Sequence, residues 1–200
     1  MVIRLPGILL CAMLSACGGN SSSSGASGNK ENLLVVLGDS IGYGYQTSVR
    51  FPDILQNLSG IPVINNSIPG NSAEQGVADA PGLIKQHNPR YLAVLLGTNN
   101  ALGAGGEVDG AIRTMEDLAQ ICKDTATVCI LGTLPPITAS SNENNAVNQI
   151  NAGYLGVAGG RVRIADANSV MNGSHLNSDG IHPNNSGQQV IAEAFAAQLP

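Results

Sequence analysis

An unbroken apolar run that ends in glycine, aspartate and serine constrains the fold of this chain more than any other feature. The run covers Leu33–Leu37 and continues directly into Gly38-Asp39-Ser40. A strand exposed on one face alternates apolar with polar residues, so an unbroken run predicts a strand covered on both faces, as in a parallel sheet. Ligands bind at the carboxyl ends of such strands. We therefore expect Ser40 at the edge of a site, although the tripeptide alone also suits a turn capped by Asp39 or Ser40.

Strand and helix patterns alternate along the rest of the chain. Further strands are predicted at 61–66, 91–96, 127–131 and 162–165, and helices at 51–58, 73–87 with breaks, 108–123, 144–157 and 186–199, the last with Ser186 as a cap. This alternation predicts an α/β fold, a three-layer α/β/α sandwich around a five-stranded parallel sheet, with the doubly wound, flavodoxin-like strand order 2-1-3-4-5. The long loop 166–185 has no regular period, and loops of this length are usually functional.

The composition fits one folded domain and excludes a nucleic-acid partner. Two hundred residues with 43% hydrophobic content are enough for one core. The formal net charge is -5, only nine residues are Lys or Arg, and Trp is absent from a chain with 3% aromatic residues. Neither phosphate neutralisation nor base stacking has the side chains that it needs.

The N-terminus is predicted to lie outside the folded domain. Residues 1–16 carry one positive charge, at Arg4, followed by an apolar run from Leu5 to Leu14 that is too short to span a bilayer, and they are typical of a signal peptide. Leu14-Ser15-Ala16-Cys17 resembles the bacterial lipobox, which implies lipid attachment at Cys17. Residues 17–29, rich in Ser and Gly, are predicted to form a flexible tether, and residues 30–200 the folded domain.

The expected location follows from the same segment. Gly18 stands where a retention signal would place Asp, so the resemblance favours an exported protein anchored to the membrane through Cys17, at the outer membrane or the periplasmic face. An ordinary signal peptide with an incidental Cys17 is the alternative.

Asp179 and His182 supply what a nucleophilic serine needs. A hydroxyl is a weak nucleophile until an imidazole accepts its proton, and a carboxylate fixes the tautomer of that imidazole. Asp179 and His182 stand three apart in the sequence Asp-Gly-Ile-His-Pro, so one turn can present both. Alone, this turn is equally compatible with an ordinary surface loop.

Three donors can stabilise the negative charge that develops on a carbonyl oxygen during acyl transfer. They are the Ser40 N–H, the Gly70 N–H and the side-chain amide of Asn99, which follow three different predicted strands. Gly70 can equally shape a turn and Asn99 can cap one. In the predicted strand order the three loops lie side by side, which favours an oxyanion hole.

The motifs together resemble the GDSL, or SGNH, hydrolases. The resemblance rests on Gly38-Asp39-Ser40-Ile41, Gly70, Gly97-Thr98-Asn99-Asn100 and Asp179-Gly180-Ile181-His182-Pro183, four blocks in order across nearly the whole predicted domain. It implies Ser40 as nucleophile, His182 as general base and then acid, Asp179 as its orienting group, an oxyanion hole of Ser40, Gly70 and Asn99, and no metal or organic cofactor. Asn100 departs from the family block, which usually ends in Asp, and this puts the geometry of its loop in question.

The predicted function is a serine esterase that hydrolyses carboxylic esters through an acyl-enzyme on Ser40. Arylesterase, lysophospholipase and thioesterase activities all use this chemistry, and the sequence does not separate them. The alternative is a catalytically silent, envelope-binding lipoprotein on the same fold, which Asn100 alone favours. The expected partners are a small-molecule or lipid ester and, through Cys17, a membrane; the sequence does not indicate an oligomeric state.

The remaining cysteines and histidines point to structural roles. In an exported protein Cys122 and Cys129 can form a disulfide between the end of a helix and the next strand, or remain two buried thiols. His87 stands near a predicted helix end and His175 in the last loop, and no cluster of metal ligands accompanies either of them. We therefore expect no metal site.

Overall fold

The protein contains one five-stranded, all-parallel sheet with the strand order predicted from the sequence. The structure is a computed structural model, and it describes residues 30–104 and 106–200. The sheet runs in the order β2-β1-β3-β4-β5. Its strands are β1 (Glu31–Gly38), β2 (Val63–Ser67), β3 (Pro89–Leu95), β4 (Val128–Gly132) and β5 (Val162–Ala165). The α/β/α fold class is thereby confirmed.

The first strand lies inside the sheet and is covered on both faces, as its apolar run predicts. It pairs in parallel with β2 on one side and β3 on the other, with Gly38 aligned to Ser67 and to Leu95. The side chains of Leu34–Leu37 are completely buried. The carboxyl ends of β1, β2 and β3 therefore lie next to one another, with Ser40 directly after the central one.

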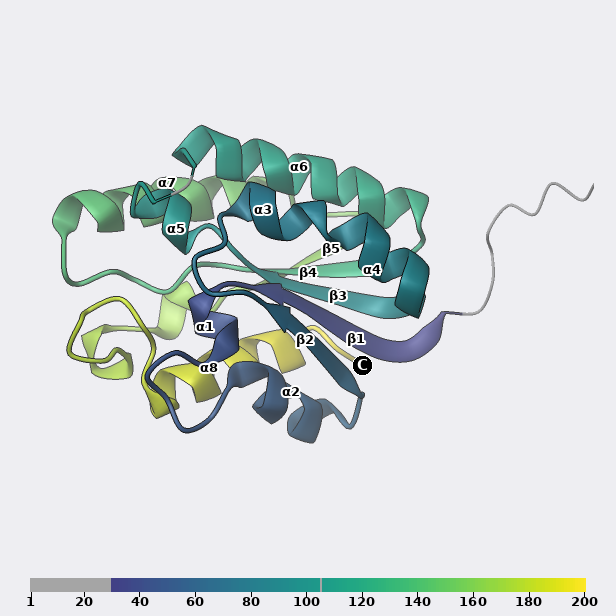
Figure 1. Cartoon of the computed structure of the whole chain (residues 1–200), viewed down its shortest axis with the longest axis horizontal. Helices are drawn as coiled ribbons and strands as arrows, with labels where there is room; N and C mark the ends of the chain where they lie inside the picture. The colour runs from purple at the N-terminus through teal and green to yellow at the C-terminus, as the bar shows by residue number, and fades with distance from the viewer. Residues whose placement is uncertain (1–29, 105) are drawn as a thin grey trace, which may run out of the picture.

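Helices cover both faces of the sheet (Figure 1). One layer contains α1 (Ser40–Tyr43), α2 (Phe51–Ser59) and α8 (Asn185–Ala196). The other contains α3 (Ala73–Ala78), α4 (Ala80–His87), α5 (Thr98–Ala101), α6 (Val108–Asp124) and α7 (Ser141–Gly156). The amphipathic pattern of 108–123 is reproduced by α6, whose buried residues include Ala111, Met115 and Leu118. The predicted helix at 73–87 is divided at Asp79, between α3 and α4, and the breaks expected at Gly76 and at Pro81-Gly82 do not occur, because these residues lie within the two helices.

The last loop is more ordered than its sequence indicates. It contains two short 3-10 helices, η1 (Asn168–Val170) and η2 (Gly173–His175). The prediction of Ser186 as the cap of the last helix is wrong. Asn184 is the cap, since its side-chain oxygen accepts hydrogen bonds from the Ser186 and Gly187 N–H groups. Both residues are good caps by type, and only the backbone path after Pro183 selects Asn184.

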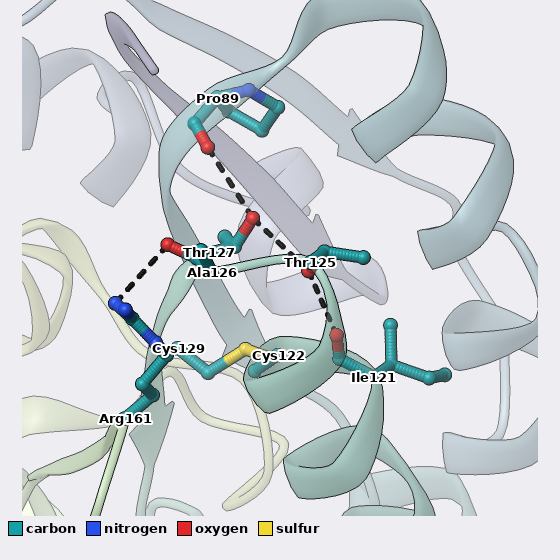
Figure 2. The surroundings of a disulfide bond; sticks show 8 residues. All are labelled: Pro89, Ile121, Cys122, Thr125, Ala126, Thr127, Cys129 and Arg161. Atoms are coloured by element: carbon teal, nitrogen blue, oxygen red, sulfur yellow. Dashed lines mark hydrogen bonds between the residues drawn. A yellow bond between two sulfur atoms is a disulfide. The ribbon is translucent and has the colours of Figure 1, made fainter. Parts of the chain in front are cut away.

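A disulfide joins α6 to β4 at the end of the sheet remote from Ser40 (Figure 2). Cys122 and Cys129 are bonded, with their Cα atoms 6.0 Å apart, and both side chains are buried. The turn between them is held by the Thr125 hydroxyl, which donates to the Ile121 carbonyl at 2.7 Å, and by Arg161, which donates to the Ala126 carbonyl. The cross-link therefore fixes a single helix-to-strand connection.

The predicted signal peptide, Cys17 and the tether lie outside the described residues. Within 30–104 and 106–200, no helix has both the length and the apolar character to cross a bilayer.

Candidate active site

Ser40 is the first residue of α1 and stands where β1 ends. Asp39 caps this helix, because its Oδ1 accepts a hydrogen bond of 2.9 Å from the Ile41 N–H. A serine at a helix N-terminus places unpaired backbone N–H groups beside its own hydroxyl. Both interpretations of the Gly-Asp-Ser tripeptide therefore apply together: Asp39 makes the turn, and the turn presents Ser40.

The carboxyl group of Asp39, the residue before Ser40, is completely buried. The buried side chain of Thr98 lies beside this carboxyl group and favours its charged form. Burial raises the pKa of Asp39 to about 6, against the hydrogen bond from the Ile41 N–H and the nearby His182, both of which favour the charged form. At neutral pH the site thus holds a buried negative charge next to the imidazole.

The structure brings Ser40, His182 and Asp179 together in one hydrogen-bonded chain. Ser40 Oγ lies 3.0 Å from His182 Nε2, and His182 Nδ1 lies 2.8 Å from Asp179 Oδ2. An ionised carboxylate only accepts hydrogen bonds, so Nδ1 carries the proton and the Nε2 lone pair faces the Ser40 hydroxyl. This tautomer is the one that can take a proton from serine.

A tight turn places Asp179 and His182. Asp179 Oδ1 accepts hydrogen bonds from the Ile181 and His182 N–H groups at 2.9 and 3.0 Å. The Asn177 N–H donates to the His182 carbonyl at 2.8 Å and closes the turn. Partial burial acts to raise the pKa of Asp179, but these two backbone bonds and the imidazole together hold it below its usual value. Asp179 is therefore an anion throughout the neutral range.

Tyr45 and Gln188 connect the C-terminal part of the domain to the segment that follows β1. The ring of Tyr45 lies against that of His182, with 4.7 Å between the ring centres. Gln188, on α8, is completely buried and bridges the first helices: it accepts from the Phe51 N–H and donates to the Ile41 carbonyl. Sequence reasoning missed Gln188, since a lone glutamine in an amphipathic helix is normally a surface residue.

The two other predicted oxyanion donors are Gly70, in the loop after β2, and Asn99, in the short helix α5 after β3. Gly70 has φ +87°, a conformation that glycine adopts without strain. The side chain of Asn99 donates one amide hydrogen to the Asn71 carbonyl at 2.9 Å. An amide group has two hydrogens, so the second one remains for a ligand. The loop after β2 is also tied to β1, because the Ile68 N–H donates to the Gly38 carbonyl at 3.0 Å.

Asn100 braces these loops from inside the protein. Its Oδ1 accepts a hydrogen bond of 2.9 Å from the Ala73 N–H at the start of α3. Its Nδ2 donates to both carboxylate oxygens of Glu74, at 2.9 and 3.3 Å, and to the Glu107 carbonyl at 3.2 Å. The departure from the family Asp is therefore matched by an acceptor, Glu74, that an aspartate would repel. The loop geometry that this departure puts in question is held by hydrogen bonds on every side of the amide.

The Asn100–Glu74 pair requires glycine beside it. A Cβ atom on Gly106 would lie 2.2 Å from Asn100 Nδ2, and one on Gly110 would lie 2.3 Å from Glu74 Oε1. Burial acts to raise the pKa of Glu74, but the amide of Asn100 and further hydrogen bonds hold it below its usual value. At neutral pH the Glu74 carboxyl group is therefore ionised, and the pair carries one negative charge.

No triad of His, Cys, Asp or Glu side chains gathers into a metal-binding arrangement in the part of the chain that the structure describes. His175 instead accepts a hydrogen bond from the Asn172 N–H through Nδ1 and so completes the capping box of η2, whose cap is Asn172.

Comparison with known proteins agrees with this arrangement. The model of the GDSL-like lipase/acylhydrolase family matches residues 36–190. The chain is 31% identical over 177 residues to thioesterase 1/protease 1/lysophospholipase L1 of Escherichia coli, covering 84% of this chain and 83% of that protein. It is 37% identical over 108 residues to an arylesterase of Vibrio mimicus, covering 50% of this chain and 49% of that protein.

Solved structures share the fold at low identity. An acetylxylan esterase from Geobacillus stearothermophilus superposes with a TM-score of 0.73 at 16% identity, covering 84% of this chain and 94% of that one. The match over most of the domain and the 31% identity show the family. The chain therefore belongs to the GDSL-like lipase/acylhydrolase family, as a serine ester hydrolase.

Proposed function

We propose that Ser40 is the nucleophile of this hydrolase, His182 its general base and acid, and Asp179 the group that orients the imidazole. The observation that carries the proposal is the chain of contacts from Ser40 Oγ to His182 Nε2 at 3.0 Å and from Nδ1 to Asp179 Oδ2 at 2.8 Å. Three segments that are remote in the sequence meet at hydrogen-bonding distance in the order that proton transfer requires.

The reaction follows from these positions. Ser40 Oγ attacks the ester carbonyl carbon as its proton moves to His182 Nε2, and the carbonyl electron pair becomes an oxyanion. The Ser40 N–H, the Gly70 N–H and the Asn99 amide are the donors that we assign to it. Collapse expels the alcohol, which takes the proton from Nε2. Water then attacks the acyl-enzyme, with Nε2 as the base, and as the carboxylic acid leaves Ser40 Oγ takes the proton back from Nε2.

Replacing Ser40 by Ala tests the assignment. We expect kcat for p-nitrophenyl acetate to fall by about 10⁴-fold or more, and labelling by a fluorophosphonate probe to disappear. Ser141→Ala, at an exposed serine that opens α7, is the matched control and should keep both. Undiminished turnover in Ser40→Ala would remove Ser40 from the reaction, and an unmodified protein that neither reacts nor turns over would favour the envelope-binding alternative.

The comparisons support acyl substrates without ranking them. The relatives are described as a thioesterase and lysophospholipase and as an arylesterase, and we propose that this chain also acts on oxygen or sulfur esters of carboxylic acids. No cofactor enters the proposed steps.

We further propose that the protein is exported and anchored through a lipid on Cys17, at the outer membrane or the periplasmic face. The support is the sequence Leu14-Ser15-Ala16-Cys17-Gly18 and the apolar run before it. In cells fed an alkynyl fatty acid, the full-length chain should become labelled and sediment with membranes, whereas Cys17→Ala should lose the label. Equal labelling of both chains would overturn the assignment of Cys17.

A further inference from the structure

The helix α7 buries two polar side chains that the proposed reaction steps do not use. They are Asn151 and Tyr154, whereas the buried residues of α6 are all apolar. Buried polar groups in native proteins are hydrogen-bonded, so their partners show what a helix holds in place. Both side chains bind backbone atoms of segments that follow β3 and β4, at the edge of the sheet where Ser40 lies.

Tyr154 holds the segment between β3 and α5. Its side chain is completely buried, and its Oη donates a hydrogen bond to the Leu96 carbonyl at 2.9 Å. Leu96 and Gly97 are the two residues that separate β3 from α5, and Asn99 is the second residue of α5. A Cβ atom on Gly97 would lie 2.6 Å from Tyr154 Oη. The glycine therefore leaves the space that the tyrosine hydroxyl needs.

Leu96 is held by a second helix as well. A Cβ atom on Gly76, in α3, would overlap Leu96 Cδ1, so the leucine side chain packs directly against the α3 backbone. The residue is thus fixed at its side chain by α3 and at its carbonyl by α7. A helix of four residues such as α5 has little rigidity of its own. The position of α5, and of Asn99 in it, therefore depends on contacts of this kind.

The hydroxyl of Tyr154 stays a donor at every pH at which the reaction runs. Burial raises the pKa of Tyr154, and the negative charges of Glu74 and Asp39 raise it further. The phenol is therefore protonated throughout the neutral range. Its hydrogen bond keeps the Leu96 carbonyl in one place while His182 gains and loses a proton.

The helix that carries Tyr154 is itself anchored to the loop after β4. Asn151 Oδ1 accepts a hydrogen bond from the Leu134 N–H at 2.7 Å, and its Nδ2 donates to the Leu134 carbonyl at 3.0 Å. Two turns earlier in α7, Asn144 Oδ1 accepts from the Ile137 N–H at 2.9 Å. A side chain on a helix that is fixed in this way holds its partner more precisely than one on a loop.

The loop after β4 continues to the catalytic turn. The Thr138 N–H donates to the Gly180 carbonyl at 2.8 Å, and Gly180 directly follows Asp179. The helix α7 is thus connected through Tyr154 to the segment before Asn99, and through this loop to the turn that carries the acid and base groups. One helix therefore serves as the common support of both halves of the site.

We propose that Tyr154 is a positioning residue of the reaction, which fixes the side-chain amide of Asn99 at the place where the oxyanion forms. The inference rests on the proposed function of Ser40 and of the oxyanion donors, and adds a residue that acts through the backbone. Oxyanion donors lower the barrier only when they are aimed before the charge develops. A shift of the Leu96 carbonyl moves the start of α5, so loss of the tyrosine hydroxyl should affect the chemical step and not substrate binding.

Tyr154→Phe removes the hydroxyl and keeps the ring in the core. For p-nitrophenyl acetate we expect kcat to fall about tenfold and KM to change by less than about twofold, because an interaction made only with the transition state appears in kcat. Active sites are counted by complete labelling with a fluorophosphonate probe, so that an unfolded fraction does not lower the measured kcat. Tyr91→Phe, at a buried tyrosine near the other end of β3, is the matched control and should keep both constants.

A double-mutant cycle with Asn99→Ala separates a positioning role from a purely structural one. Asn99→Ala alone should lower kcat about 10²- to 10³-fold, the cost of one oxyanion donor. If Tyr154 acts through Asn99, adding Tyr154→Phe to Asn99→Ala should lower kcat further by less than about twofold. A hydroxyl that only stabilises the fold costs the same in both backgrounds, so a second loss of about tenfold would overturn the inference.

Gly97→Ala disturbs the same contact from the other side. Its methyl group would lie 2.6 Å from the tyrosine oxygen and should displace it, which lowers kcat at nearly unchanged KM. Phenylalanine has no atom at that position, so adding Tyr154→Phe should leave kcat equal to that of Gly97→Ala or raise it up to about threefold; the backbone strain at φ +118° remains in both. A double variant about tenfold slower than Gly97→Ala would contradict the proposal, even if Tyr154→Phe alone were unstable.

The outcomes distinguish failure of this inference from failure of the proposed function. If Ser40→Ala abolishes turnover and Asn99→Ala leaves kcat unchanged, Tyr154 has no donor to position, and the inference falls while the nucleophile stands. If Tyr154→Phe raises KM and leaves kcat unchanged, the residue acts on binding, which also overturns the inference. An unmodified protein that hydrolyses no ester would overturn the catalytic assignment as well.

Discussion

The two sides of the Ser40 hydroxyl are built by different means. On the nucleophile side, Asp39 caps the helix that begins at Ser40, and the side chains of Asn99 and Asn100 in α5 bond to the loop after β2 and to the start of α3. On the base side, Asp179 and His182 belong to a loop that one carboxylate braces through two backbone N–H groups, and the Thr138 N–H donates to the Gly180 carbonyl of this loop at 2.8 Å. The side chains of Asp39 and Asn100 are buried, whereas those of His182 and Asp179 are part-exposed.

This difference separates two requirements of a serine hydrolase. The oxyanion donors must not move as charge develops, because their effect depends on preorganisation, and loops fixed to adjacent strands satisfy this. The imidazole must exchange protons with a serine, an alcohol and a water in turn, and an edge loop gives access to all three. Variants on the base side should therefore affect the chemical step directly, while variants on the nucleophile side act through geometry and stability.

The largest effect is expected from Asp179→Asn on the base side. The introduced amide can keep one acceptor for the Ile181 and His182 N–H groups, but its nitrogen then faces His182 Nδ1 and stabilises the wrong tautomer. We expect kcat to fall about 10³- to 10⁴-fold with little change in KM. Circular dichroism and urea unfolding serve as the folding control, and a loss of activity that only follows unfolding would contradict the tautomer explanation.

Asn100→Asp should be the most damaging change on the nucleophile side. The new carboxylate would face that of Glu74 across the present 2.9 Å contact. We expect a loss of about 2–3 kcal/mol in the free energy of unfolding and a 10- to 100-fold fall in kcat, roughly the cost of displacing a donor.

Because Asn100 pairs with Glu74, a second substitution at Glu74 tests the same prediction. Adding Glu74→Gln to Asn100→Asp removes the repulsion and should restore most of the activity, whereas Glu74→Gln alone should have a small effect. Lowering the pH from 8 to 5 should partly restore the free energy of unfolding of the single variant, measured by urea unfolding, since one of the two facing carboxyls then takes up a proton. A double variant no better than Asn100→Asp would show that the two residues act independently.

Asp39→Asn should raise the free energy of unfolding at neutral pH and lower kcat slightly. The pKa of Asp39 is raised from 3.8 to about 6, so between these values the folded chain holds a proton that the unfolded chain has released. Its contribution to the free energy of unfolding is therefore full below pH 4 and is lost as the pH rises through 6, by about 3 kcal/mol in total.

An asparagine at this position can still cap α1. It does not titrate, so the pH-dependent loss in the free energy of unfolding disappears. Urea unfolding at several pH values should show the variant gaining on the parent as the pH rises from 4 to 7. The nearby charge also favours the imidazolium that forms during catalysis, so we expect kcat to fall about two- to tenfold. A constant difference in stability at all pH values would mean that Asp39 does not titrate in this range.

Removing the disulfide should affect neither side of the site. Cys122→Ala with Cys129→Ala should lower the free energy of unfolding by about 2 kcal/mol, because the closed loop is short, and should leave kcat/KM unchanged at 25 °C. Urea unfolding with and without a reducing agent measures the first effect and ester hydrolysis the second. A change in kcat would show that the far end of β4 is coupled to the catalytic edge.

The fold was predictable because its signals are local and repeated. The unbroken apolar run in β1, the amphipathic pattern of α6 and the regular alternation of strand and helix each indicate the same doubly wound sheet. Helix ends were less predictable: Asn184 and Ser186 are both good caps, and α7 begins at Ser141 rather than 144 because Ser140 caps it.

The sequence by itself determined which residues have the chemistry of a serine hydrolase, since a hydroxyl, an imidazole and a carboxylate are properties of residue type and their order matches the family. Only the tertiary structure decided that Asn100 fits through Glu74 and that Gln188 joins α8 to the first helices. The reason is physical. These contacts join segments that are distant along the chain, and a polar side chain shows its partner only when the backbone brings the two together.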